Sequence, residues 1–355
     1  MLIVPTDGGT ALAATRDARF ADIVDYLRAG DVLVVNDAAT FPASLSGRLR
    51  DGDDDSADGG RDVELRLLGP TGESASDADG GEMWRAVVFG AGDWHRPTEE
   101  RPAPPAPRRG ATLAIGARLR ATVVGESPLS PRLVTLAFNL RDAALWAALY
   151  QAGKPVQYSY LDDDLDLWSV QTVYGARPWA AEMPSAGRPL TWSLLRALLR
   201  RGVKVVRLTH AAGLSATGDP AIDRALPLPE RFDIPAATVA AIRAARRAGH
   251  RVIAVGTSVV RALEGCVALH GQLRAGEGTT DLVIDETLRP QLVDGLLTGV
   301  HSPTESHFRL LRAFAGEDSL QAAWAESDRL GYRYHEFGDT WLIGDLRGPR
   351  PARRA

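Results

Sequence analysis

The segment RVIAVGTSVVRALE, residues 251–264, constrains the fold more than any other part of the sequence. An apolar run at 252–255 is followed by Gly256, Thr257 and Ser258, and then by a stretch of helical character. This pattern predicts a buried strand, a tight turn and the N-terminus of a helix. Such a turn directs free backbone N–H groups and the positive helix end toward one point, which suits an anionic or strongly polar ligand.

The same pattern is also typical of an ordinary strand–turn–helix unit in which Thr257 or Ser258 only caps the helix. Arg261 and Glu264 lie three residues apart and therefore share one face of the predicted helix. From the local pattern alone, a capped structural helix and a ligand-binding helix N-terminus both stay open.

Length and composition indicate a globular protein with two domains. The chain has 355 residues, which exceeds the usual size of one hydrophobic core, and its 45% hydrophobic and 24% charged residues are ordinary for a soluble protein. No apolar run is long enough to span a membrane, and the first residues lack the basic start and apolar core of a signal peptide. We therefore expect a cytoplasmic protein without membrane contact.

Cysteine content and charge narrow the classes of ligand. The single cysteine, Cys266, excludes a disulfide framework and a cysteine-based metal site, and we expect no metal. The net charge of −4 does not predict nucleic-acid binding, although a local arginine patch could still provide it. The basic C-terminal run at 347–355 is expected to be a disordered tail.

The distribution of apolar runs predicts an α/β fold with an inserted β domain. Strands and helices alternate at the start of the chain and again in its second half, where one strand is predicted at 282–284. The part between them has short strands separated by long polar loops, which is typical of a small β-barrel. We therefore predict a main α/β domain made of residues 1–48 and 141–346, and a β-barrel domain at 49–140.

A turn pair, Asn36 and Asp37, follows a predicted buried strand at 32–35. Ligands in α/β sheets usually bind at the carboxyl ends of strands, so this pair is a candidate site. The alternative is that both side chains only form an Asx turn.

Further motifs occur along the whole chain. They are GDVLVVND at 30–37, VELRL at 63–67, QTVY at 171–174, PSAG at 184–187, Val293-Asp294 with Thr298, His301 and Pro303, and FGD at 337–339 with Leu342-Ile343. Together with GTSVVRALE at 256–264 they resemble, in the same order, the motifs of the S-adenosylmethionine:tRNA ribosyltransferase-isomerases of queuosine biosynthesis. The chain is identified as a divergent member of that family, over a match that extends to about Ile343.

The resemblance implies a reaction and a fold. Enzymes of this family transfer the ribosyl part of S-adenosylmethionine to a 7-aminomethyl-7-deazaguanine in a tRNA anticodon, which forms epoxyqueuosine and releases adenine and methionine. Their fold is a barrel-like α/β domain with an inserted β-barrel. S-adenosylmethionine would then be the co-substrate and the tRNA anticodon loop the partner, with no metal. We also expect a monomer.

This chemistry suggests roles for particular residues. The sulfonium makes the neighbouring C5′ protons acidic, so a positioned base is needed, and the departing adenine needs a proton donor, His301 or Asp339. The candidate bases are Asp37, Glu264, Asp339 and His301. The methionine carboxylate needs an anion site, which the helix start at Gly256 and Arg261 would supply. The full set of expected donor contacts is Asn36, Gly256, Thr257, Ser258, Arg261 and Gly338. The expected acceptor contacts are Gln171, Tyr174, His210 and Thr298.

The sequence departs from the family pattern mainly where the acceptor would bind. Two arginines after the ND pair are replaced by Ala39 and Ser44, which removes possible phosphate contacts. A histidine-rich segment reads ALPLPER at 225–231, and an FSYGD segment reads HEFGD at 335–339. The usual lead-in before residue 2 is missing, which we interpret as a shortened or misassigned start. Since the residues assigned to the donor are kept, we expect a reshaped acceptor pocket.

Three functions stay open on the sequence. The first is the family reaction on the queuosine-precursor tRNA. The second uses the same donor with another nucleoside or a small-molecule acceptor. The third is a non-catalytic nucleoside-binding module, against which the retained titratable residues argue.

Overall fold

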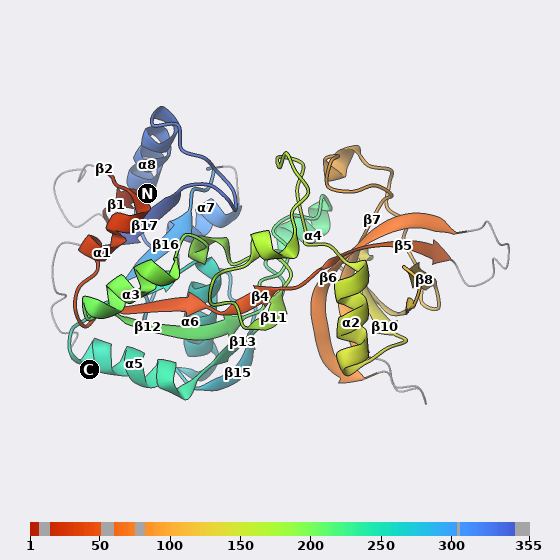
Figure 1. The fold of residues 1–355 in the computed structure, drawn as a ribbon, viewed down its shortest axis with the longest axis horizontal. Coiled ribbons are helices and arrows are strands. Elements are labelled where there is room, and N and C mark those ends of the chain that lie inside the picture. Colours follow the sequence, from red (N-terminus) through yellow and green to blue (C-terminus); the bar gives the residue numbers. More distant parts are fainter. Residues whose placement is uncertain (7–14, 51–59, 75–81, 304–305, 345–355) are drawn as a thin grey trace.

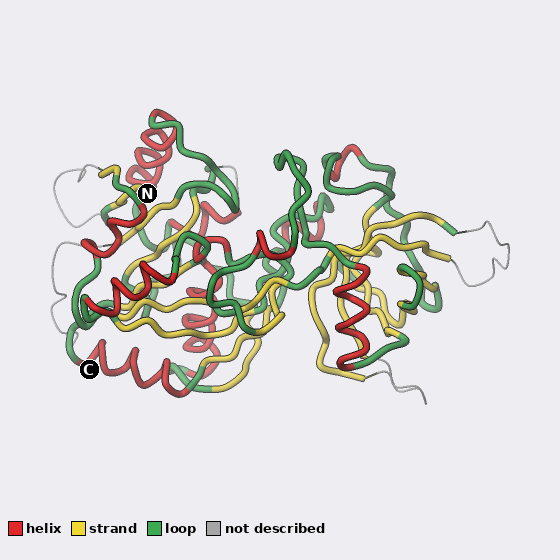
Figure 2. Tube along the Cα trace, in the orientation of Figure 1, coloured by secondary structure: helices red, strands yellow, loops and turns green. Residues whose placement is uncertain are grey.

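The computed structural model describes residues 1–6, 15–50, 60–74, 82–303 and 306–344. Figure 1 shows a β-barrel at one end of the molecule and a large sheet with its helices at the other end. Figure 2 shows that most helices gather around the large sheet, whereas the barrel end is built mainly of strands. The predicted class, a mixed α/β unit with a small inserted β-barrel, is confirmed. The basic tail at 347–355 lies outside the described residues.

The main sheet has nine strands and mixed direction. In spatial order they are β15 (Gly276–Thr280), β13 (Glu230–Ile234), β12 (Lys204–His210), β3 (Val32–Asn36), β14 (Val252–Val255), β16 (Gly295–Gly299), β17 (Thr340–Gly344), β1 (Leu2–Val4) and β2 (Arg16–Asp17). The central strands β12, β3, β14 and β16 are parallel, and β17 is antiparallel to β16. The carboxyl ends of the four parallel strands therefore meet at one edge with the start of β17. The main sheet ends in two edge strands, β15 and β2, so it is open where the resemblance implied a barrel-like sheet.

Helices cover both faces of this sheet. Side chains along β3 alternate between two cores, with Val32 and Val34 in one and Leu33 and Val35 in the other, as the period of a strand requires. The first core is completed by α5 (Ala236–Arg247), α6 (Thr257–His270), α7 (Ser306–Leu311) and α8 (Glu317–Arg329). The second core is completed by η1 (Phe20–Asp22), α1 (Ile23–Tyr26) and α3 (Trp192–Arg200). The main unit thus has three layers.

The barrel closes in the order β10-β7-β6-β5-β8-β9. Its strands are β5 (Ser44–Arg50), β6 (Arg61–Ser74), β7 (Glu82–Phe89), β8 (Thr112–Ile115), β9 (Leu119–Ser127) and β10 (Ser130–Phe138). Trp84 is fully buried in the barrel core and contacts Phe41 and Phe138 edge to face, at centroid distances of 5.7 and 6.2 Å. The helix α2 (Asp142–Ala152) packs Leu145 and Leu149 into the same core. We therefore propose that the barrel unit spans 44–152.

Short elements connect the two units. They are β4 (Ala38–Thr40), which pairs with β11 (Arg177–Ala180), and the short helices η3 (Leu167–Val170), η4 (Ser185–Gly187) and α4 (Pro220–Ala225). The short helix η2 (Thr98–Glu100) lies between β7 and β8 of the barrel unit. The strand predicted at 282–284 is wrong, because these residues form a loop and the strand lies just before them, in β15. Its sequence, GEGTT, has no apolar pattern, and pairing with β13 makes it a strand. Among the described helices, none is long and apolar enough to cross a membrane.

Candidate active site

The candidate active site lies at the sheet edge where the parallel strands end. The last residues of these strands are Asn36 in β3, His210 in β12, Val255 in β14 and Gly299 in β16. In the pairing of β16 with β17, Gly299 lies opposite Thr340. The structure therefore brings together four predicted segments, which are Asn36-Asp37, Gly256–Ser258, Thr298–His301 and Gly338-Asp339.

The turn between β14 and α6 has the geometry that the sequence predicts for ligand binding. Gly256 is the N-cap of α6, with a φ of 88° that favours glycine, and no side chain caps this helix. The first N–H groups of the helix have no intrahelical acceptor, and Thr257 and Ser258 are partly exposed. The positive end of α6 is thus available to an anionic group at the sheet edge.

Asn36 joins the ends of three elements. Its Nδ2 donates to the carbonyl oxygen of His210 at 3.0 Å and to Ser258 Oγ at 3.2 Å. Its Oδ1 accepts from the N–H groups of His210 and Ala38, at 2.9 and 3.0 Å. Because the amide is buried and bonded on both sides, Asn36 fixes β3, β12 and α6 relative to one another. The Asx contact to Ala38 shows that the turn alternative also applies.

Asp37 is buried behind the sheet edge, with 5% of its surface exposed. Its Oδ1 accepts from Thr209 Oγ1 at 2.6 Å, and its Oδ2 lies 3.5 Å from Arg207 Nε. Burial, with a smaller contribution from the Asp37 charge, raises the pKa of Tyr174 well above its usual value. A side chain at Gly187 would collide with the Tyr174 hydroxyl, which explains the glycine in PSAG. The QTVY and PSAG motifs therefore pack together near Asp37.

His301 and Asp339 occupy adjacent turns. The Nε2 of His301 lies 3.1 Å from the hydroxyl of Thr298, which is buried at the end of β16. The Asp339 carboxylate accepts from the N–H of Arg333 at 3.0 Å, and its backbone oxygen accepts from the N–H of Val300 at 3.3 Å. Thr298 thus orients the imidazole, and Asp339 joins its own turn to β16.

A groove of about 900 Å³ opens beside Asp339. The side chains on its walls include Asp17, Phe20, Asp22, Pro189, Tyr332 and Asp339. Its volume lies in the range of small-molecule sites, and its three carboxylates outnumber the two cations on its walls, Arg19 and the N-terminal ammonium of Met1, by one.

A buried ion pair lies behind the start of α6. Arg261 Nε donates to Glu230 Oε2 at 2.9 Å, and another nitrogen of Arg261 donates to the carbonyl oxygen of Leu282 at 2.9 Å. Glu230 also accepts from the N–H of Gly213 at 2.9 Å. Arg261 therefore points to Glu230 and the loop at 282, and its contact to a carboxylate of the donor stays a prediction.

His210 is completely buried next to this ion pair, with its Nε2 3.4 Å from Glu230 Oε2. Burial lowers the pKa of His210 to about 4, assisted by Arg261 and opposed by Glu230. The imidazole is therefore neutral at pH 7. A buried ring does not meet an acceptor directly, so we assign His210 to positioning the end of β12.

Two predicted site residues hold backbone segments instead. The Glu264 carboxylate accepts three N–H groups at 291–293, at 2.9 to 3.0 Å, and this segment precedes β16 at the opposite edge of the sheet. The Gln171 amide pairs with the backbone of Thr40 in both directions, at 3.0 and 2.8 Å. These contacts give Glu264 and Gln171 structural tasks, while the expected base and acceptor contact stay predictions.

Glu230 was not recognised from the sequence, although it fixes both Arg261 and His210. The available signal was its place as the acidic residue of ALPLPER, directly before the alternating residues 231–234. The residues that the structure describes contain no cluster of three or more side chains that could hold a metal ion.

The chain is similar in sequence to known proteins. The family model of the queuosine biosynthesis protein matches residues 1–343. The S-adenosylmethionine:tRNA ribosyltransferase-isomerase of Moorella thermoacetica is 31% identical over 352 residues, which cover 96% of this chain and 94% of that protein. The protein of the same name from Methylocella silvestris is 32% identical over 354 residues, which cover 96% and 90%.

A solved structure is also similar. The crystal structure of S-adenosylmethionine tRNA ribosyltransferase from Thermotoga maritima aligns with a TM-score of 0.48 and 24% identity, over 96% of this chain and 90% of that one. The fold and the site define an α/β protein with a ligand site at the carboxyl ends of its parallel strands. The family match is more specific: the chain belongs to the queuosine biosynthesis protein family.

Proposed function

We propose that the chain is an enzyme that transfers the ribosyl part of S-adenosylmethionine to 7-aminomethyl-7-deazaguanine in tRNA, with isomerisation to epoxyqueuosine and release of adenine and methionine. The observation that carries this proposal is the match to relatives named for this reaction over nearly their whole length. We further propose a cytoplasmic monomer that needs no metal.

In this proposal the donor lies along the sheet edge. Its carboxylate binds the N–H groups of Thr257 and Ser258, where the positive end of α6 compensates the charge; the N–H of Gly256 donates to Leu297. Its positively charged sulfonium lies toward the groove beside Asp339. The start of α6 and the start of β17 are two strands apart, roughly 10 Å from the usual strand spacing, which S-adenosylmethionine can bridge.

His301 is our choice for the base that removes a C5′ proton. Its ring is partly exposed at the sheet edge and oriented by Thr298, as a general base requires. Asp37 is less suited because it is buried and engages Thr209 and Arg207. Asp339, in the turn beside His301, is placed to hydrogen-bond the departing adenine.

A second candidate function keeps the donor and uses a free small-molecule acceptor. The observation that favours it is the acidic run at 162–166, whose Asp164 lies 3.7 Å from Lys154 at the junction of the two units. Like charges there repel the phosphates of an RNA, and the family arginines at positions 39 and 44 are absent.

One assay separates these functions. Adenine release is measured with S-adenosylmethionine alone, with precursor tRNA, and with free 7-aminomethyl-7-deazaguanine. Release that depends on the tRNA supports the first function, and release with the free base supports the second. A protein that does not bind S-adenosylmethionine at all would refute both.

A further inference from the structure

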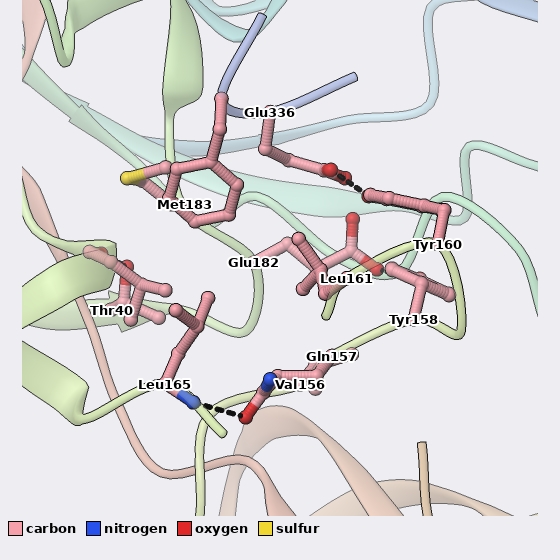
Figure 3. Close-up of a pocket in the computed structure, with 12 residues that line it drawn as sticks. Thr40, Val156, Gln157, Tyr158, Tyr160, Leu161, Leu165, Glu182, Met183 and Glu336 are labelled. Carbon is pink, nitrogen blue, oxygen red and sulfur yellow. Dashed lines mark hydrogen bonds between the residues drawn. The ribbon is translucent and has the colours of Figure 1, made fainter. Parts of the chain in front are cut away.

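A second pocket lies between β4 and the loops near residues 160, 183 and 337 (Figure 3). The side chains that concern us are Tyr158, Tyr160, Glu182, Met183, Glu336 and Phe337. We call it the Tyr–Glu pocket. Phe337 directly precedes Gly338-Asp339, and Thr40 on its wall is held by Gln171. The pocket therefore borders the proposed donor site.

The Glu182 carboxylate lies in the middle of this pocket (Figure 3). Its Oε1 accepts from the N–H of Ser215 at 3.0 Å and from the Tyr158 hydroxyl. Within the described parts of the chain, no group donates a hydrogen bond to Glu182 Oε2. Burial raises the pKa of Glu182. One acceptor oxygen is thus available to a ligand in a poorly solvated place.

Glu336 is covered by a partly exposed tyrosine, Tyr160. Its Oε2 accepts from the Tyr160 hydroxyl, and Tyr160 is 41% exposed. The Tyr160 ring stacks on His335, with a centroid distance of 4.0 Å and an interplanar angle of 15°. Burial raises the pKa of Glu336 as well. Rotation of Tyr160 into solvent would uncover both this carboxylate and the face of His335.

Two arginines lie near these carboxylates: Arg66 acts on Glu182, and Arg188 stacks on Phe337 at 4.7 Å from the ring centroid. The Arg66 guanidinium lies behind the Tyr158 ring, 5.3 Å from its centroid, but its Nε donates to Glu64 at 2.9 Å inside the barrel. The loop at 162–166, which follows Tyr160, adds more carboxylates. Because the carboxylates outnumber the two arginines, a ligand with positive charge would be favoured in this pocket.

We propose that the Tyr–Glu pocket is the acceptor subsite and that it binds a flat aromatic ring through a protonated amine. An ammonium group has three donors and no acceptor, so it can bond Glu182 Oε2 and Glu336 together. The aromatic ring stacks on the face of Tyr158 or of His335. Both rings already lie nearly parallel to the ring of Tyr160. This assignment rests on the proposed function, which supplies the identity of the acceptor. The two carboxylates of the pocket would recognise the amine of that acceptor.

Ligand entry requires one movement. The cavity now measures about 20 Å³, which is room for about one water molecule. A ring enters when Tyr160 swings out, and the incoming amine takes over the hydrogen bond that Tyr160 donates to Glu336. The amine thus replaces one donor by another at the same carboxylate, so the carboxylate is not left unpaired.

The test compares two bases that differ in the amine. Binding of 7-aminomethyl-7-deazaguanine and of 7-methyl-7-deazaguanine is measured by calorimetry on the full chain and on Glu182→Gln and Glu336→Gln. We expect the wild type to prefer the amine by at least about tenfold, the usual worth of a hydrogen bond between charged groups. Each Gln variant should lose most of this preference and bind the methyl base as before. The matched control is Glu277→Gln, on the exposed edge strand β15.

Two further measurements make the outcome decisive. Affinity for S-adenosylmethionine is measured on every variant and shows whether the variant is folded. If the wild type does not bind S-adenosylmethionine, the proposed function is contradicted. With donor binding intact, an equal affinity of the wild type for both bases, or Gln variants that keep the full preference, would overturn only the acceptor assignment. Tyr160→Phe removes the competing hydroxyl and should tighten binding of the amine several-fold; weaker binding would contradict the replacement of Tyr160.

Discussion

The sheet edge and the Tyr–Glu pocket are neighbours, but they are built from different kinds of structure. At the edge, the proposed ligand groups are backbone N–H groups of α6 and side chains at strand ends, such as Thr298. In the pocket, they are side chains on loops, among them Tyr160 and Glu336. Changes at strand ends disturb the fold, whereas loop side chains can be exchanged more freely. We infer that donor binding is tied to the fold and acceptor selection to the loops.

The largest effect is expected from His301→Ala. If His301 is the base, adenine release should fall by about a hundred- to ten-thousand-fold, the usual contribution of general base catalysis. Affinity for S-adenosylmethionine should change little, because Thr298 and the helix start stay in place. His270→Ala, at the exposed end of α6, serves as the control. Normal turnover of the His301 variant would remove this residue from the mechanism.

The pH dependence of stability tests whether His210 is buried and neutral at the sheet edge. His210 has a folded-state pKa of about 4 against 6.5 in the unfolded chain, so below pH 6.5 the unfolded state takes up a proton that the folded state does not. The free energy of unfolding should therefore fall by about 3 kcal/mol between these two pH values through His210. Urea unfolding of wild type and His210→Gln measures this as a difference in slope. Equal slopes would contradict the buried, neutral His210, and His270→Gln should match the wild type.

A glycine pair separates the ligand role of the α6 N-terminus from its backbone strain. Gly256 and Gly271 flank the same helix with φ values of 88° and 68°. Alanine should cost about 1–2 kcal/mol of stability at Gly271, which is in the left-handed helical region, and about 1–3 kcal/mol at Gly256, whose ψ of 156° places it in a region accessible essentially only to glycine. Only Gly256→Ala should also weaken S-adenosylmethionine, by about tenfold, because it disturbs the N–H groups of the predicted anion site. Equal affinities of the two variants for S-adenosylmethionine would contradict the role of the helix start in binding the donor.

The smallest effect concerns the pH dependence of acceptor binding. Burial raises the pKa of both Glu182 and Glu336, so these carboxyls take up protons at a higher pH than usual. A protonated carboxyl no longer attracts an ammonium, so affinity for 7-aminomethyl-7-deazaguanine should fall several-fold as the pH drops from about 7 to about 5. The groups facing them are Tyr158, Ser215 and Arg66 for Glu182, and Tyr160 with His335 for Glu336. Calorimetry at both pH values measures this affinity, and 7-methyl-7-deazaguanine, whose binding should not depend on pH, is the comparison.

The sequence predicted the parts of the fold that rest on local patterns. The apolar runs at 32–35 and 252–255 and the turn at Gly256 predicted two central strands and the helix start, and the resemblance grouped Asn36 and Gly256 as donor contacts. The tasks of Glu264 and Arg261 could not be predicted, because their partners, 291–293 and Glu230, lie far away in the chain. The strand β15 was not predicted for the same reason, because its polar residues form a strand only by pairing with β13.

The central claim, that donor and acceptor sites are separately built, is tested most directly by one crossed set of affinities. Calorimetry measures S-adenosylmethionine and 7-aminomethyl-7-deazaguanine on Gly256→Ala and on Glu182→Gln. We predict that Gly256→Ala weakens the donor about tenfold and leaves the acceptor unchanged, and that Glu182→Gln does the reverse. If both variants weaken both ligands equally, or if each affects the wrong ligand, the two sites are not arranged as proposed.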